Sequence, residues 1–142
     1  MWKWSLMLLA PVTFGCTSEP SWEGKTAAAW RKELHSQDAT GRARAATAFT
    51  LLIPPQTQAI PDLMRLLNDP DEHVCQEACL ALGFMGPPAK KAVPLLLEAY
   101  KSKHRGVRMM AGVALQKIDP QEAAKAGVVI DDSDHGHAHE HG

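Results

Sequence analysis

The sequence predicts an all-α protein, a short α-solenoid of two to three helix-turn-helix repeats with disordered termini. The first observation is self-similarity, because prolines, alanines and large apolar residues recur every 33 residues without a gap. The clearest matching positions are Pro54, Pro87 and Pro120, then Ala45, Ala78 and Ala111, and finally Phe49, Leu82 and Leu115. The second observation is that apolar residues between the proline-rich turns follow helical spacing. A two-helix repeat of this length is typical of α-solenoids, in which each unit buries its apolar face against the next.

Length and composition limit the classes of protein that fit. A chain of 142 residues that is 45% hydrophobic is long enough for one modest domain with tails. A net charge of −1 argues against an electrostatic interaction with nucleic acid. Three cysteines are too few to form a disulfide framework.

Residues 1–15 have the pattern of an export signal peptide. Lys3 precedes an apolar run that is too short to cross a bilayer as a helix. The pair Gly15-Cys16 is similar to the end of a bacterial lipoprotein signal, where the cysteine is lipidated after cleavage. Thr13 and Phe14 depart from the usual residues, so a plain signal, an uncleaved anchor and a cytosolic N-terminus are the alternatives. We expect lipidation of Cys16, export, membrane anchoring in the cell envelope, and a tether over residues 16–25.

The repeat domain is expected over residues 26–127. Residues 25–34 correspond by register to the second helix of a repeat, so this helix should cap the N-terminal end of the stack with Trp30 in the core. The first full unit begins at Asp38, and Pro54-Pro55 ends its first helix because proline disfavours helical geometry before it. Pro61 fits the first turn of the helix that follows.

The central unit, residues 69–100, carries the clearest start signals. Asp69 is predicted to cap the helix, with Pro70 in the first helical position and Glu72 three residues after the cap. The third unit ends in a short helix that starts at Asp119-Pro120 and stops at Gly127. This helix should close the C-terminal end of the stack.

These units resemble the HEAT-like repeats first associated with phycobilisome lyases. The residues that carry the resemblance are Asp69-Pro70-Asp71, Val74, Ala78, Leu82-Gly83, Gly86, Ala92-Val93-Pro94, Leu96 and Leu97. The resemblance covers about residues 26–126 and implies the fold, whereas such repeats serve many unrelated binding tasks. The lyase activity of the namesake family is not expected here, because its chromophore substrates are cytoplasmic and this chain has an export signal.

Two features inside the repeats admit a chemical or a structural interpretation. Cys75 and Cys79 are four residues apart, as in a soft-metal pair, but Cys79 occupies a small-residue packing position, so we interpret both as core. Arg42 and Arg108 share a register. The resemblance implies that such an arginine pairs with an acidic residue near a helix start, for which Asp38 and Asp71 are the candidates, and anion binding is the alternative.

Five polar residues on the second helices are candidate partner contacts. Second helices usually line one face of a solenoid, so polar positions that point away from the core are presented to a partner. These residues are Lys32, Gln58, Arg65, Lys91 and Glu98. Ordinary solvated surface is the alternative interpretation.

The last segment, residues 128–142, is an acidic, histidine-rich tail that we expect to be disordered. Four histidines alternate with small or acidic residues, at His135, His137, His139 and His141. Imidazoles and nearby carboxylates suit Zn²⁺, Ni²⁺ or Cu²⁺. A polar solubilising tail would look similar, and no metal is required for the fold.

The sequence contains no arrangement that supports catalysis. We therefore expect a non-catalytic module for protein–protein interaction, tethered to a membrane as a lipoprotein. The alternative is a metal-handling envelope protein in which the repeats are a scaffold and the tail binds the metal.

Overall fold

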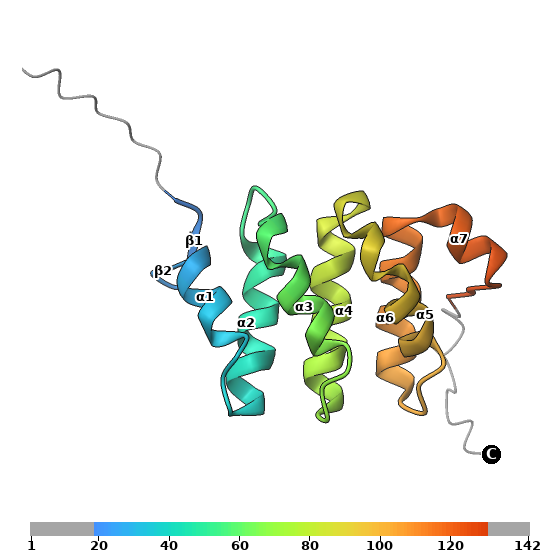
Figure 1. Ribbon diagram of the computed structural model, residues 1–142, viewed down its shortest axis with the longest axis horizontal. Coiled ribbons are helices and arrows are strands. Elements are labelled where there is room, and N and C mark those ends of the chain that lie inside the picture. The colour runs from blue at the N-terminus through green and yellow to red at the C-terminus, as the bar shows by residue number, and fades with distance from the viewer. Residues whose placement is uncertain (1–18, 131–142) are drawn as a thin grey trace, which may run out of the picture.

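Helices stacked in two layers form the structure, a computed structural model that describes residues 19–130. The predicted signal peptide, Cys16 and the four tail histidines lie outside these residues. In the described part the fold is an all-α solenoid of helical hairpins, as predicted (Figure 1).

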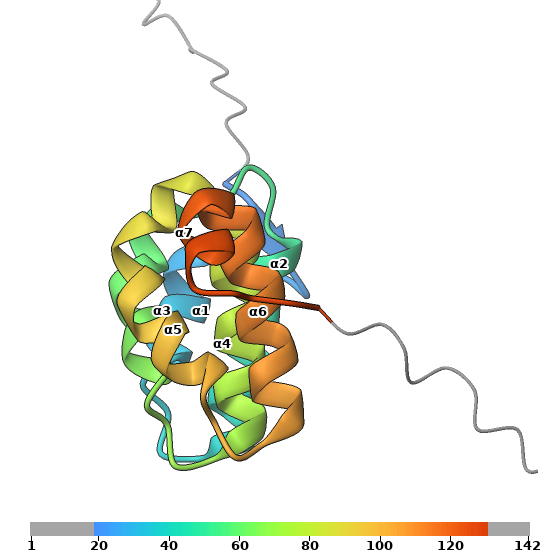
Figure 2. The same ribbon diagram turned by 90° about the vertical axis from the view of Figure 1, so that its right-hand side faces the viewer.

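The layers correspond to the first and second helices of the repeats. One layer holds α2 (Ala39–Leu51), α4 (Glu72–Met85) and α6 (Arg105–Ile118). The other holds α1 (Ala27–Glu33), α3 (Ile60–Leu66) and α5 (Val93–Tyr100), with the 3₁₀ turns η1 (Thr57–Ala59) and η2 (Pro87–Ala92) before the last two. Figure 2 shows the two layers side by side, with the last helix, α7 (Pro120–Lys125), at the end of the stack.

Aspartates start three of the helices by binding their free amides. Asp38 accepts a hydrogen bond from Gly41 N at 2.9 Å, and Asp119 accepts one from Glu122 N at 3.1 Å. In the central repeat the predicted cap was wrong by two residues, because Asp71 accepts from His73 N at 2.9 Å and α4 begins at Glu72. The carboxylate of Asp69 instead accepts from Asp71 N at 3.0 Å and shapes the turn before the helix.

The N-terminal end of the stack is covered by more than the helix that the sequence predicts. Residues 21–26, which fall mostly within the expected tether, form a short antiparallel hairpin of β1 (Ser21–Trp22) and β2 (Lys25–Thr26). Trp30 is fully buried, as predicted, and its indole N–H donates to the Trp22 carbonyl at 3.1 Å. The two indole rings lie 5.2 Å apart, so the hairpin adds an apolar cover to the cap.

Among residues 19–130, no helix is long and apolar enough to span a bilayer.

Candidate partner-binding face

The five predicted contact residues all lie in the second-helix layer. Lys32 is on α1, Gln58 in η1, Arg65 on α3, Lys91 in η2 and Glu98 on α5, and all five are exposed. We call the surface made by α1, η1, α3, η2 and α5 the second-helix face. Its side chains differ in what they contact, and a groove separates two of the five from the other three.

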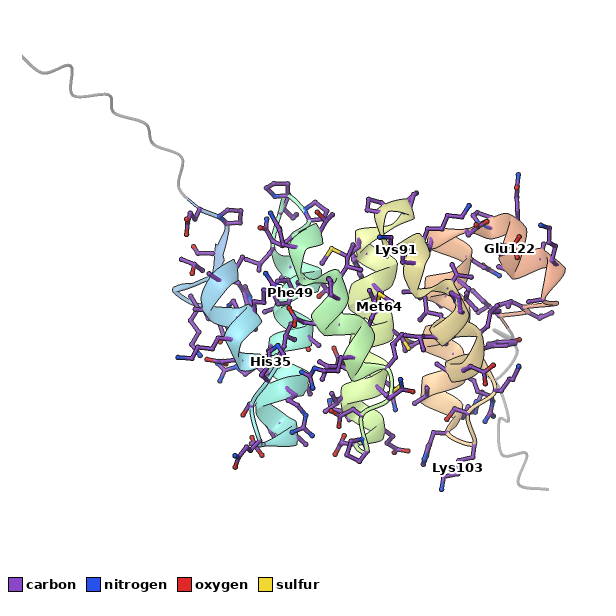
Figure 3. All side chains as sticks on the ribbon, viewed as in Figure 1. His35, Phe49, Met64, Lys91, Lys103 and Glu122 are labelled. Atoms are coloured by element: carbon purple, nitrogen blue, oxygen red, sulfur yellow. The ribbon has the colours of Figure 1, made fainter. Side chains whose placement is uncertain are left out.

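This groove lies between α1 and η1–α3 and has a volume of about 630 Å³. Its floor is apolar, and polar side chains from both helices form its rim. Figure 3 shows Phe49 and His35 between α1 and α3. The lining residues are Glu19, Pro20, Ala27, Ala28, Arg31, Lys32, His35, Phe49, Gln56, Gln58, Ala59 and Asp62. An apolar floor with a few polar rim groups is the usual composition of a binding site.

Three rim residues form an ionic link across the groove. Asp62 on α3 accepts from Arg31 Nε at 2.5 Å, and its other oxygen lies 2.8 Å from His35 Nε2. Burial alone would raise the pKa of Asp62, but its hydrogen bonds with Arg31 and His35 outweigh burial and lower it. Asp62 is therefore ionised at neutral pH and joins α1 to α3. Its oxygens are occupied, which leaves Lys32 and Gln58 as rim groups for a partner.

Sequence reasoning missed this link. Arg31 and Asp62 are 31 residues apart, so the spacing of 33 residues does not align them. The one available signal is that Asp62 follows Pro61 in the first turn of a helix, where an acid is favourable for the helix dipole.

The other three predicted residues are not part of the groove. Arg65 Nη2 donates to the Leu34 carbonyl at 2.8 Å, so this side chain partly serves to join α3 to α1. Glu98 lies 3.2 Å from Lys101 and borders a smaller notch of about 280 Å³. Lys91 lies toward the edge where η2 begins (Figure 3). The structure thus brings Lys32 and Gln58 together and leaves Arg65, Lys91 and Glu98 spread over the face.

Cys75 and Cys79 are buried in the core, which confirms the packing interpretation. The Cys75 thiol donates to the Leu67 carbonyl at 3.1 Å. The hydrogen bond with Cys75, together with burial, raises the pKa of the Cys79 thiol, so it stays protonated and is a poor metal ligand. Across residues 19–130 no three His, Cys, Asp or Glu side chains are grouped to hold a metal.

The predicted inter-repeat salt bridge of Arg42 is present, with a different acid. Arg42 Nε and Nη2 donate to the two oxygens of Asp69 at 2.8 and 3.0 Å. The expected partners, Asp38 and Asp71, bind helix amides instead. In the last repeat, Arg108 Nη1 donates to the carbonyls of Ser102 and Lys103 at 2.8 and 2.9 Å. Arg42 repeats this pattern with Ser36 and Gln37, so the arginine register has a structural role.

Paired helices in two layers, each pair displaced along one axis, define the class of α-solenoid repeat proteins. A family model of HEAT repeats matches residues 27–92, from α1 to the end of η2. The chain is a HEAT-like repeat protein.

Two solved structures are similar to it. The crystal structure of an engineered protein is 28% identical, with a TM-score of 0.57 over 70% of this chain and 49% of its own. The complex of CpcE and CpcF of phycocyanin lyase from Nostoc sp. PCC7120 is 24% identical, with a TM-score of 0.62 over 82% of this chain and 45% of its own. The chain therefore spans about half the length of each. No curated protein matches the chain at a significant level.

Proposed function

We propose that this protein is a non-catalytic repeat module that binds another protein through its second-helix face, and that a lipid on Cys16 tethers it to the membrane of a bacterial cell envelope. The groove between α1 and η1–α3 carries the binding part of the proposal. It combines an apolar floor with Lys32 and Gln58 on the rim, and the Asp62 link holds its two walls together before a partner arrives.

The comparisons are consistent with a protein partner. HEAT repeats present extended surfaces to other macromolecules. The similar structure from Nostoc is, by its title, a complex of two proteins. The tether is supported by residues 1–16 alone, in which a short apolar run precedes Gly15-Cys16.

The proposal predicts that a partner contacts position 58 in native membranes. A photo-crosslinking residue in place of Gln58 should capture one protein, and the same residue in place of Gln116, exposed on the first-helix layer, should not. Lys32→Glu should abolish the capture at position 58, because it reverses the charge of the rim. Mass spectrometry of the same sample should find a mature N-terminus at lipidated Cys16.

Lys103→Glu is the matched control, since Lys103 is exposed in the turn before α6, far from the groove (Figure 3). Equal capture at positions 58 and 116, or equal loss with Lys32→Glu and Lys103→Glu, would rule out the groove as the binding site.

A second candidate function is metal handling by the tail. The observation that favours it is the alternation of four histidines from His135 to His141 behind three aspartates. Neutral imidazoles bind Zn²⁺, Ni²⁺ and Cu²⁺, and protons compete with the metal. In this candidate the repeats present the tail and the tail binds the ion.

A further inference from the structure

Large apolar side chains are exposed along one edge of the solenoid. The first-layer helices end at this edge, and the turns that lead into η1 and η2 lie on it (Figure 1). Leu51 is 49% exposed, Ile53 is 82% exposed and Phe84 is 50% exposed. We call these three residues the apolar edge.

The repeat spacing makes this edge continuous. Leu51 and Phe84 are 33 residues apart, so they occupy equivalent places at the ends of α2 and α4, which pack side by side. Exposed prolines flank them in both turns, at Pro54, Pro55, Pro87 and Pro88. The solenoid core does not require apolar residues at these sites, so their exposure indicates a surface that something covers.

The charge pattern selects what covers it. The turn over residues 52–58 contains no charged residue, whereas the opposite edge carries Asp69, Asp71 and Glu72 in one turn. Cations lie beside the apolar edge: Lys91 is exposed in η2, and Lys117 Nζ lies 4.8 Å from the centre of the Phe84 ring. Glu19 is an acid at the point of chain entry. Apolar side chains flanked by lysines suit a membrane interface with anionic headgroups.

The N-terminal tether reaches the domain at this same edge. Glu19 and Pro20 line the groove together with Gln56 and Gln58, next to the turn that carries Ile53. Both views show the chain entering the domain from the edge where that turn lies (Figures 1 and 2). Cys16 is three residues before Glu19, so the two are separated by at most roughly 10 Å of extended chain.

We propose that the apolar edge rests on the lipid surface, with Ile53 and Phe84 at the interface and Lys91 and Lys117 among the headgroups. The inference rests on the proposed lipid tether, which holds this edge close to the bilayer. The axis of the stack then runs along the membrane, and the opposite edge points into the aqueous phase. The groove opens sideways, where a soluble or a membrane-bound partner can reach it.

Single fluorescent labels test this orientation. Cys75 and Cys79 are buried and the tether cysteine is acylated, so a cysteine introduced at the surface is the reactive one. Lipidated protein with Ile53→Cys, Phe84→Cys or Lys103→Cys is labelled and reconstituted into phosphatidylethanolamine–phosphatidylglycerol vesicles that contain a spin-labelled lipid quencher. We expect several-fold stronger quenching at positions 53 and 84 than at 103. Equal quenching at all three positions, or stronger quenching at 103, overturns the proposal.

Flotation of the same vesicles separates the orientation from the tether. Protein that floats and shows no difference between the edges retains its tether and loses the orientation. If Cys16 proves not to be acylated, the tether fails, and the mature chain from residue 16 with Cys16→Ser decides the edge by itself. This chain should bind the same vesicles weakly, and Ile53→Asp with Phe84→Asp should abolish the binding while Lys103→Asp does not. Absence of binding, or equal binding by all variants, rejects the edge as a lipid surface.

Discussion

Arg42 shows how one side chain joins two repeats. Its guanidinium donates to both oxygens of Asp69 in the next repeat and to two carbonyls in the turn before its own helix. The side chain of Asp69 is 5% exposed. Burial would raise the pKa of Asp69, but the hydrogen bonds from Arg42 and from the Asp71 amide lower it. A bidentate pair of this kind is geometrically specific, unlike an isolated surface pair.

Arg42→Ala should lower the thermal midpoint at neutral pH, because it leaves the Asp69 carboxylate without its main partner. Arg44→Ala is the control, since Arg44 pairs with Glu23 at the surface and such pairs contribute little. Thermal unfolding followed by circular dichroism measures both.

The pH dependence provides a second check on this pair. Because the folded-state pKa of Asp69 is below the ordinary value of about 3.9, its contribution is present above that pH and is lost as the pH falls through the folded pKa. The difference in midpoint between the wild type and Arg42→Ala should therefore shrink below about pH 4. A difference that stays constant to low pH, or one that Arg44→Ala reproduces, would contradict the assignment.

The helix α4 lies between α2 and α6 and carries the centre of the core. Its buried side chains include Val74, Ala78 and Leu82, each fully inaccessible to solvent. A side chain at Gly83 would meet the backbone of α6, since an added Cβ lies 3.1 Å from Ala114 Cα. A glycine is therefore what lets these two helices approach closely.

Gly83→Val should destabilise the fold by about 1–3 kcal/mol, because the added atoms force α4 and α6 apart. Gly106→Val is the matched control. An added Cβ at Gly106 meets the amide end of the Gln76 side chain, which can move away. Both variants place the same residue in a helix, so the difference between them isolates the close approach. Urea unfolding measures both, and equal destabilisation would show that the approach at Gly83 does not matter.

The whole molecule divides into a repeat domain and the terminal segments. The described residues hold no group of three side chains suited to a metal, and the two buried cysteines serve packing. Metal chemistry is therefore expected in the tail and binding in the domain. The two functions should be separable by truncation.

Removal of residues 131–142 should abolish reversible Zn²⁺ or Ni²⁺ binding and leave helicity and thermal midpoint nearly unchanged. The full-length protein should release the metal as the pH falls through about 6.5, where unperturbed imidazoles become charged. Titration calorimetry on both proteins measures this. Metal retained by the truncated chain would place the site in the domain, and no binding by the full-length chain would remove the metal-handling candidate.

The sequence alone determined the repeat, the two-layer all-α fold, the capping position of Trp30 and the core positions of Cys75 and Cys79. It could do so because periodic burial is a local property: a residue at the same place in each repeat meets the same environment. The exposed positions of Lys32 and Gln58 followed from the same register.

Only the tertiary structure decided which groups meet across repeats. Arg42 reaches Asp69, and Arg31 reaches Asp62, because neighbouring repeats are offset in space by an amount that sequence spacing does not encode. The same offset moved the cap of α4 to Asp71, since Asp69 was already bound by Arg42. The apolar edge emerged in the same way, because an exposed Ile53 and an exposed Phe84 form one surface only when their helices end side by side.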